Sequence, residues 1–183
     1  MLFGELGITS TKLAEEFVSG VLTKMRRIDA DVKPPCSGGS RPIWNGVVRD
    51  VLAKLGNMHG YDATYPWLVD FIWWSNKPQR MGLAVESELD KSARAIEDDF
   101  EKLCVFKCPI KLMVFSSDAE DTKKMAERYL QTLTQHVKDE EYLLIGFTAS
   151  GPRCFLFRVP ADGSLAQVNF SELQLSKAVV AGS

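Results

Sequence analysis

The sequence is poor in the residues that build zinc or nucleotide sites. It has two histidines, His59 and His136, far apart in the chain, and four scattered cysteines that form no CxxC pair. Zinc sites need clustered cysteine and histidine, so none is expected, and scattered thiols are typical of a reduced cytoplasmic protein. The Gly38-Gly39 pair is not followed by GK[ST], which excludes a nucleotide-binding P-loop.

Long apolar runs and a strong net charge are also missing. No run approaches the length of a membrane span, about 18 residues, and the first residues lack the basic and apolar regions of a secretory signal. We therefore expect a cytoplasmic protein that does not insert into membranes. The net charge of −2 gives no general attraction to nucleic acid, so DNA binding would need a local basic patch.

What is present predicts one α/β domain. The 183 residues are 45% hydrophobic and 25% charged, which is ordinary for a globular protein. We expect an N-terminal helix within 1–30, a core over 40–160, and a weakly patterned tail over 161–183. Strand–helix–strand units favour parallel pairing, and short connections favour hairpins. The pattern therefore predicts a mixed central sheet flanked by helices on both faces.

Apolar periodicity and turn residues predict the individual elements. Helices are predicted over Thr9–Asp29, from the N-cap Ser40 to a C-cap at Gly56, from the cap Asp90 to before Pro109, and from a Ser117–Glu120 capping box to about Lys138. Strands are predicted over 66–74, 82–89, 110–115, 142–148 and 154–159, with a turn over 57–64 and a hairpin connection over 75–80.

Three carboxylates stand out in this pattern. Asp70 lies inside the apolar run 66–74, where burying an ionised carboxylate is costly unless it is paired or bound to a metal. Glu86 and Glu88 share one face of the next strand, about 6.5–7 Å apart. If the register places Asp70 opposite Glu86, the three side chains converge. Otherwise Asp70 is satisfied by backbone amides or by Arg80, and both glutamates face solvent from an edge strand.

The carboxylates suggest a particular class of metal. A few hard oxygen ligands, completed by water, are typical of Mg²⁺ or Mn²⁺ beside a phosphate. Such an ion lowers the pKa of a bound water and neutralises the charge that develops on the phosphate. In this scheme Asp70 and Glu86 ligate the metal, and Glu88 either completes the site or orients the attacking water.

The spacing resembles a known nuclease motif. Asp70, fifteen residues and then Glu86-Ser87-Glu88 are similar to the signature of the PD-(D/E)xK superfamily, in which a minority of members have Glu-x-Glu. The resemblance implies a restriction-endonuclease-like αβββαβ core, extended here by an N-terminal helix and C-terminal strands. It also implies a Mg²⁺- or Mn²⁺-dependent endonuclease that hydrolyses phosphodiester bonds in DNA, with Asp70, Glu86 and Glu88 as its catalytic residues.

Two positions depart from the usual motif. Val69 stands where the family's proline would precede the aspartate, and Glu88 stands where most members have lysine. Candidates for a displaced cation are Lys91 and Lys111, and candidates for a further acidic ligand from a preceding helix are Glu16 and Asp50. Both acidic residues lie away from the apolar stripes of their helices, which argues against them.

Other features leave the function open. The basic residues best placed to reach phosphates are Arg26, Arg27, Lys77 and Arg80, whereas Trp67, Trp73 and Trp74 are expected in the core. DNA is the expected partner, and a homodimer or a larger complex would help so small a chain to grip it. The alternatives are a non-catalytic restriction-endonuclease-like domain that serves as a nucleic-acid-binding or protein-interaction module, and an adaptor that docks through its first helix and its tail.

Overall fold

The computed structural model describes residues 8–28, 33–66, 68–76, 79–90, 92–132, 139–160 and 169–175. The helices are α1 (Ser10–Ile28), the short 3₁₀ turn η2 (Pro35–Ser37), α2 (Arg41–Met58), α3 (Ala93–Val105) and α4 (Ala119–Thr132). The strands are β1 (Asp62–Thr64), β2 (Phe71–Asn76), β3 (Gln79–Glu88), β4 (Ile110–Phe115), β5 (Glu141–Thr148), β6 (Gly151–Arg158) and β7 (Asn169–Leu173).

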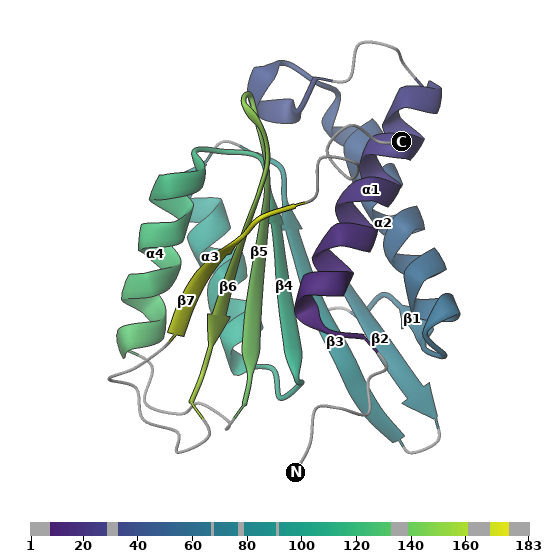
Figure 1. Ribbon diagram of the computed structural model, residues 1–183, viewed down its shortest axis with the longest axis vertical. Coiled ribbons are helices and arrows are strands. Elements are labelled where there is room, and N and C mark those ends of the chain that lie inside the picture. The colour runs from purple at the N-terminus through teal and green to yellow at the C-terminus, as the bar shows by residue number, and fades with distance from the viewer. Residues whose placement is uncertain are drawn as a thin grey trace.

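The seven strands lie side by side in their order along the chain, and helices cover both faces of the sheet (Figure 1). β3, β4 and β5 are parallel, whereas the other neighbouring pairs are antiparallel. The predicted α/β class, with a mixed central sheet between helices, is confirmed. The C-terminal ends of β3, β4 and β5 meet at one edge of the sheet, and the start of β2 lies at the same edge because β2 runs antiparallel to β3.

The core is divided between the two faces of the sheet. β4 is buried over its whole length, as expected for a strand covered on both sides. Its side chains alternate, so Leu112 and Val114 pack beneath α1 and α2, while Met113 and Phe115 pack beneath α3 and α4. α1 contributes the predicted apolar stripe, in which Phe17 is completely buried. The two helical layers therefore rest on the same three parallel strands.

Two strands lie where the sequence pattern predicts none. β1 occupies part of the predicted turn 57–64, and β7 occupies part of the predicted tail. β1 has only three residues, and residues 170–172 of β7 are all exposed, so neither strand offers an alternation long enough to be predicted. Each joins the sheet by backbone pairing with one neighbour. With β1 included, three strands precede α3, as the expected αβββαβ order requires.

The strand predicted over 66–74 begins later than expected. The residues before Phe71 form a bend, so Asp70 lies just ahead of β2 rather than within it. An apolar run predicts buried residues, and Val69 is indeed buried. Such a run does not determine the backbone conformation. The predicted connection over 75–80 is too long, because β2 and β3 continue into it from both sides.

Gly56 does not end α2 as predicted. The helix continues beyond it to a cap at His59, and the left-handed conformation, with φ of 78°, falls at Gly60. Gly56 is buried in the last turn, where a Cβ would lie 2.9 Å from Nε1 of Trp73. Glycine is required here because the Trp73 ring packs directly against the helix backbone.

The predicted cap of α3 is replaced by a neighbour. Ser92, rather than Asp90, occupies the N-cap position, and its hydroxyl accepts a hydrogen bond from the amide of Ala95 at 3.4 Å. Serine at this position satisfies one of the free amides of the first turn. The predicted end of the next helix, near Lys138, lies outside the described residues.

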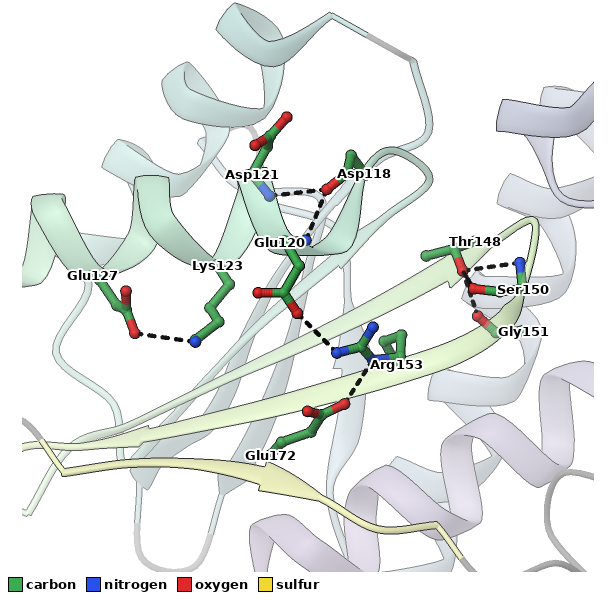
Figure 2. A network of polar contacts seen from close by, with 10 residues as sticks. All are labelled: Asp118, Glu120, Asp121, Lys123, Glu127, Thr148, Ser150, Gly151, Arg153 and Glu172. Atoms are coloured by element: carbon green, nitrogen blue, oxygen red, sulfur yellow. Dashed lines mark hydrogen bonds and ion pairs between the residues drawn. The ribbon is translucent and has the colours of Figure 1, made fainter.

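The predicted capping box of α4 is also replaced. Oδ1 of Asp118 accepts hydrogen bonds from the amides of Glu120 and Asp121, at 2.9 and 3.0 Å (Figure 2). The carboxylate of Glu120 does not turn back to the backbone. It accepts a hydrogen bond from Arg153 of β6 at 2.9 Å, and the same guanidinium binds Glu172 of β7 at 2.6 Å. Arg153 therefore links α4 to the two last strands.

A buried ion pair lies at the edge of the sheet where the parallel strands begin. Nζ of Lys111 is 2.9 Å from Oε2 of Glu140 and 2.9 Å from the hydroxyl of Tyr142, and the two charged side chains are 1% and 3% exposed. The Tyr142 hydroxyl also donates to Glu140 at 3.1 Å. Lys111 is thus committed to a structural pair and is excluded as the displaced cation of the nuclease motif.

Removing one member of this pair should destabilise the protein strongly, because the other charge stays buried. We expect Lys111→Met to lower the free energy of unfolding by about 3–5 kcal/mol. The double variant Lys111→Met/Glu140→Gln should lose less than the sum of the two single variants. Urea unfolding followed by tryptophan fluorescence measures both quantities. Lys12→Met, which breaks an exposed pair with Glu16, should cost at most about 1 kcal/mol, and additive losses would contradict the coupling.

Candidate functional site

Asp70 and Glu86 lie next to each other at the edge where the parallel strands end. Phe71 pairs with Val85 in the antiparallel β2–β3 ladder, so the preceding Asp70 falls beside Glu86. Oδ2 of Asp70 accepts a hydrogen bond from the amide of Ser87 at 3.0 Å. This bond attaches the bend before β2 to β3 and orients the Asp70 carboxylate. A backbone amide, one of the partners expected for Asp70, is therefore present.

Arg80 is the other partner considered for Asp70, and the register places it elsewhere. Arg80 pairs with Ser75, close to the hairpin end of β2 and β3. Six residues separate it from Glu86 along β3, which corresponds to about 20 Å of strand. Arg80 therefore does not neutralise the carboxylates at the opposite end.

Glu86 is the most unusual group of the site. It lies in a central strand, its side chain is 3% exposed, and its buried Oε1 atom has no hydrogen-bond partner among the described residues. Burial, together with the nearby carboxylates of Asp70 and Asp99, raises the pKa of Glu86 to about 8. The alternative of a solvated edge strand is wrong for Glu86, because β4 covers the outer side of β3.

Two residues of α3 complete the surroundings of Glu86. Nζ of Lys102 lies 3.7 Å from Oε1 of Glu86 and 2.5 Å from Oδ1 of Asp99. The hydrogen bond that Lys102 donates to Asp99 raises the pKa of Lys102, and the charge of Glu86 adds to this effect. Lys102 is 44% exposed, so its ammonium contacts both a buried carboxylate and solvent.

The sequence carries a weak signal for Asp99 but none for Lys102. Asp99 follows Ile96 by three residues and precedes Leu103 by four, so it interrupts the buried stripe of α3. A charged residue in an apolar stripe is worth attention as a site candidate. Lys102 lies beside that stripe, where lysine is ordinary, and only the packing of α3 on β3 brings it to Glu86.

Glu88 does not join Asp70 and Glu86. Its Oε1 accepts a hydrogen bond from the amide of Asp90 at 2.5 Å, and Asp90 in turn forms an ion pair with Arg41 of α2 at 2.5 Å. Partial burial raises the pKa of Glu88. Within the described part of the chain, no group of three or more Asp, Glu, His or Cys side chains lies close enough together to hold a metal ion. The expected convergence of three carboxylates is therefore reduced to two.

A small cleft opens beside Asp70, and the residues that line it include neither Glu86 nor Lys102. Its volume is about 230 Å³, and α2, the ends of β2 and β3, and α3 contribute to its walls. Its polar lining consists of Arg41, Asn45, Arg49, Asp70, Ser87, Glu88 and Asp99. Helices from opposite faces of the sheet meet at this cleft. The cleft lies at the C-terminal edge of the parallel strands, where open α/β sheets commonly bind ligands.

The further acidic candidates lie away from this cleft. Oε2 of Glu16 is 2.9 Å from Nε2 of His59, and Asp50 pairs with Lys24. Glu16 and Asp50 line a separate groove of about 780 Å³ between α1 and α2. Neither is placed to assist Asp70 and Glu86, in agreement with their positions off the helix stripes.

Several other expected residues can be placed or set aside. Trp73 is 1% exposed, and its indole N–H donates to the carbonyl of Leu52 at 3.0 Å, so it belongs to the core as predicted. Trp74 is half-buried on the same strand. The residues that lie outside the described part of the chain are Trp67, Lys77 and Lys91.

The chemistry of the two carboxylates fits a divalent cation. Mg²⁺ is commonly bound by one or two carboxylates, with waters and a substrate phosphate filling the remaining positions. Asp70 and Glu86 provide such a pair, and the unpartnered Oε1 of Glu86 is an acceptor that the described side chains leave unsatisfied. A buried acceptor of this kind is expensive unless a proton or a cation satisfies it.

Comparison with known proteins gives no family. A scan against protein-family models and searches of curated proteins and of solved structures found no match to this chain. Among the residues that the structure describes, no helix has both the length and the apolar character needed to cross a membrane. Function is therefore inferred from Asp70, Glu86 and Lys102 and from the cleft beside Asp70.

Glu86→Gln should stabilise the protein, and the gain should depend on pH. With a pKa of about 8 in the folded state and 4.5 as the ordinary value, the folded chain binds the proton more tightly. The free energy of unfolding therefore falls as pH rises from about 5 to 8. Glutamine removes this loss, so at pH 8 we expect a gain of about 1–3 kcal/mol, or roughly 2–10 °C in Tm.

Thermal unfolding at pH 5 and pH 8 measures this gain. Glu97→Gln, which breaks the exposed pair between Glu97 and Arg128, is the control and should change Tm little at either pH. A gain from Glu86→Gln that is equal at both pH values would show that burial of the charge is not its source.

Proposed function

We propose that this protein is a Mg²⁺- or Mn²⁺-dependent nuclease that hydrolyses phosphodiester bonds in DNA. The observation that supports it most is the pair of carboxylates at the strand edge, in which the buried Oε1 of Glu86 has no hydrogen-bond donor among the described residues. The sequence motif that contains this pair resembles the PD-(D/E)xK signature. The helix–three strands–helix–strand order of α2 to β4 agrees with the core of that superfamily.

In this proposal Asp70 and Glu86 hold the metal ion. When bound, the ion would lower the pKa of a water and neutralise charge on the phosphate. The amide of Ser87 keeps the Asp70 carboxylate in a fixed orientation. The backbone of Glu86 is fixed by the β3–β4 pairing, so the position from which its side chain approaches Asp70 is set before substrate arrives.

Lys102 is the residue that we propose in the role of the missing lysine. The motif places Glu88 where a cation is usual, but α3 brings an ammonium group to the other side of Glu86. Asp99 positions that ammonium through a hydrogen bond. Lys102 is exposed enough to contact a phosphate oxygen, where a fixed positive charge stabilises the developing negative charge. In this proposal Glu88, which lines the cleft beside Asp70, orients the attacking water through the oxygen that is not bound to the Asp90 amide.

The partner and the assembly follow from the same proposal. The cleft beside Asp70, of about 230 Å³, offers DNA a small surface, so we propose that the active form is a homodimer or a larger complex. A DNA-acting enzyme without a membrane-spanning helix in its described part is consistent with a cytoplasmic location.

Loss of any of the three key side chains should abolish cleavage. We expect Asp70→Ala and Glu86→Ala each to lower the rate of Mn²⁺-dependent cleavage by at least about 100-fold, and Lys102→Ala by about 10²-fold. The assay measures cleavage of plasmid, branched and single-stranded DNA with Mn²⁺ and with EDTA. Lys102→Arg should retain part of the rate, because it preserves the positive charge.

Lys124→Ala, on the exposed side of α4, is the matched control for loss of one lysine and should cleave like the wild type. Cleavage that is absent in the wild type, or that survives both Asp70→Ala and Glu86→Ala, would overturn the proposed activity.

A second candidate function is a non-catalytic module that binds nucleic acid or protein. The observation that favours it is Glu88, which binds the Asp90 amide rather than the other two carboxylates, so no three-ligand group is present in the described residues. This function predicts that calorimetry detects no Mn²⁺ binding. A micromolar Mn²⁺ site that disappears in Asp70→Ala would count against it.

A further inference from the structure

One face of α2 forms a polar wall of the cleft. Arg41, Asn45 and Arg49 follow one another at four-residue intervals, so their side chains share one side of the helix, and all three line the cleft. The adjacent side of α2 carries Trp44 and Val48, which are buried against the sheet. α2 therefore cannot rotate without exposing its apolar stripe, and the polar wall is fixed in place.

Three carboxylates, from elements other than α2, also line the cleft. Asp70 and Glu88 come from the strand ends, and Asp99 comes from α3. The cleft thus has a side with two guanidinium groups and an amide and a side with carboxylates. Phosphates bridge such surfaces well, since one side binds them directly and the other binds them through a divalent cation.

An exposed aromatic ring extends the wall at Arg49. The guanidinium carbon of Arg49 lies 5.7 Å from the centroid of the Tyr65 ring, and Tyr65 is 59% exposed. The edge of the same ring packs on Phe71, with 5.1 Å between centroids, and Phe71 lines the cleft next to Asp70. Arg49 forms no ion pair with any described residue, whereas Arg41 is paired with Asp90.

Arg49 and Tyr65 present a positive charge and an aromatic ring together on the exposed surface beside the cleft. The guanidinium of Arg49 lies over the Tyr65 ring. Proteins that bind single strands use this pairing, because aromatic rings stack on unpaired bases while arginine contacts the backbone. The two residues are held against the cleft by Phe71 and by the body of α2.

We propose that the wall formed by Arg41, Asn45 and Arg49, together with Tyr65, binds one unpaired DNA strand, with Arg49 on a phosphate and Tyr65 stacked on a base. This inference rests on the proposed nuclease function and specifies its substrate as single-stranded DNA or the unpaired part of branched DNA. A cleft of about 230 Å³ has room for one backbone segment. Stacking on Tyr65 needs a base that is not already stacked inside a duplex, so the ring favours an unpaired strand.

The test is equilibrium binding without catalysis. Fluorescence anisotropy of a short labelled DNA strand, and of the duplex of the same sequence, is measured in EDTA with the full chain. We expect the wild type to bind the single strand at least about tenfold more tightly than the duplex, and Tyr65→Ala to weaken strand binding by about tenfold. Tyr65→Phe keeps the ring and should bind like the wild type.

Arg49→Ala should weaken binding and also change its dependence on salt. Loss of one phosphate contact should lower the slope of log affinity against log salt by about 0.7. Arg158→Ala is the matched control: it removes one arginine from the end of β6, where Arg158 pairs with Glu141, and should leave both affinity and slope unchanged. Circular dichroism confirms that each variant is folded, which is expected because Tyr65 and Arg49 are exposed.

The outcomes separate this inference from the proposed activity. If the wild type does not bind the strand, binds the duplex equally well, or is unaffected by Tyr65→Ala and Arg49→Ala, the strand-binding wall is overturned even where Mn²⁺-dependent cleavage is observed. If strand binding depends on both residues but no cleavage occurs with Mn²⁺, the wall stands and the nuclease function fails.

Discussion

The parallel alignment of β3, β4 and β5 is the constraint on which the rest of the structure depends. Three central strands that are buried on both faces must be covered by two layers of helices, and α1 to α4 supply them. Because the strands point the same way, every connection that leaves them begins at one edge. The antiparallel β2 returns Asp70 to that edge. The cleft is a consequence of this geometry, and α2 and α3 close it from opposite faces.

The same constraint explains why the site is energetically costly. Glu86 is almost completely buried in a central strand, and Asp70 is held beside it by the Ser87 amide. Lys102 compensates for part of the buried charge, but a distance of 3.7 Å to Oε1 leaves that atom without a hydrogen bond. Keeping this buried pair of carboxylates lowers the stability of the folded protein. Proteins usually accept such a loss where a ligand is bound.

The sequence determines the central elements better than the edges, for physical reasons. The strand predicted over 110–115 is observed without change. The largely apolar run between Pro109 and Ser116 is too short for a helix and is typical of a strand that is buried on both faces. β1 and β7 join the sheet through backbone hydrogen bonds, which leave no pattern in the side chains.

The candidate site divides in the same way. The nearness of Asp70 and Glu86 follows from strand parity and register, which a sequence can suggest. The turn of Glu88 toward the Asp90 amide is a local choice of one side chain, and the arrival of Lys102 depends on how α3 crosses β3. Neither can be read from spacing.

The order of strands across the sheet has a further consequence, for the folding rate. Each strand pairs with its neighbour in the chain, but the parallel pairs are joined through helices, so Leu83 pairs with Ile110 and Ile110 pairs with Glu141. Parallel pairing of this kind slows folding, because a long loop must close before the contacts form. The hairpins β2–β3 and β5–β6, whose partners are close in the chain, should therefore form before the parallel centre.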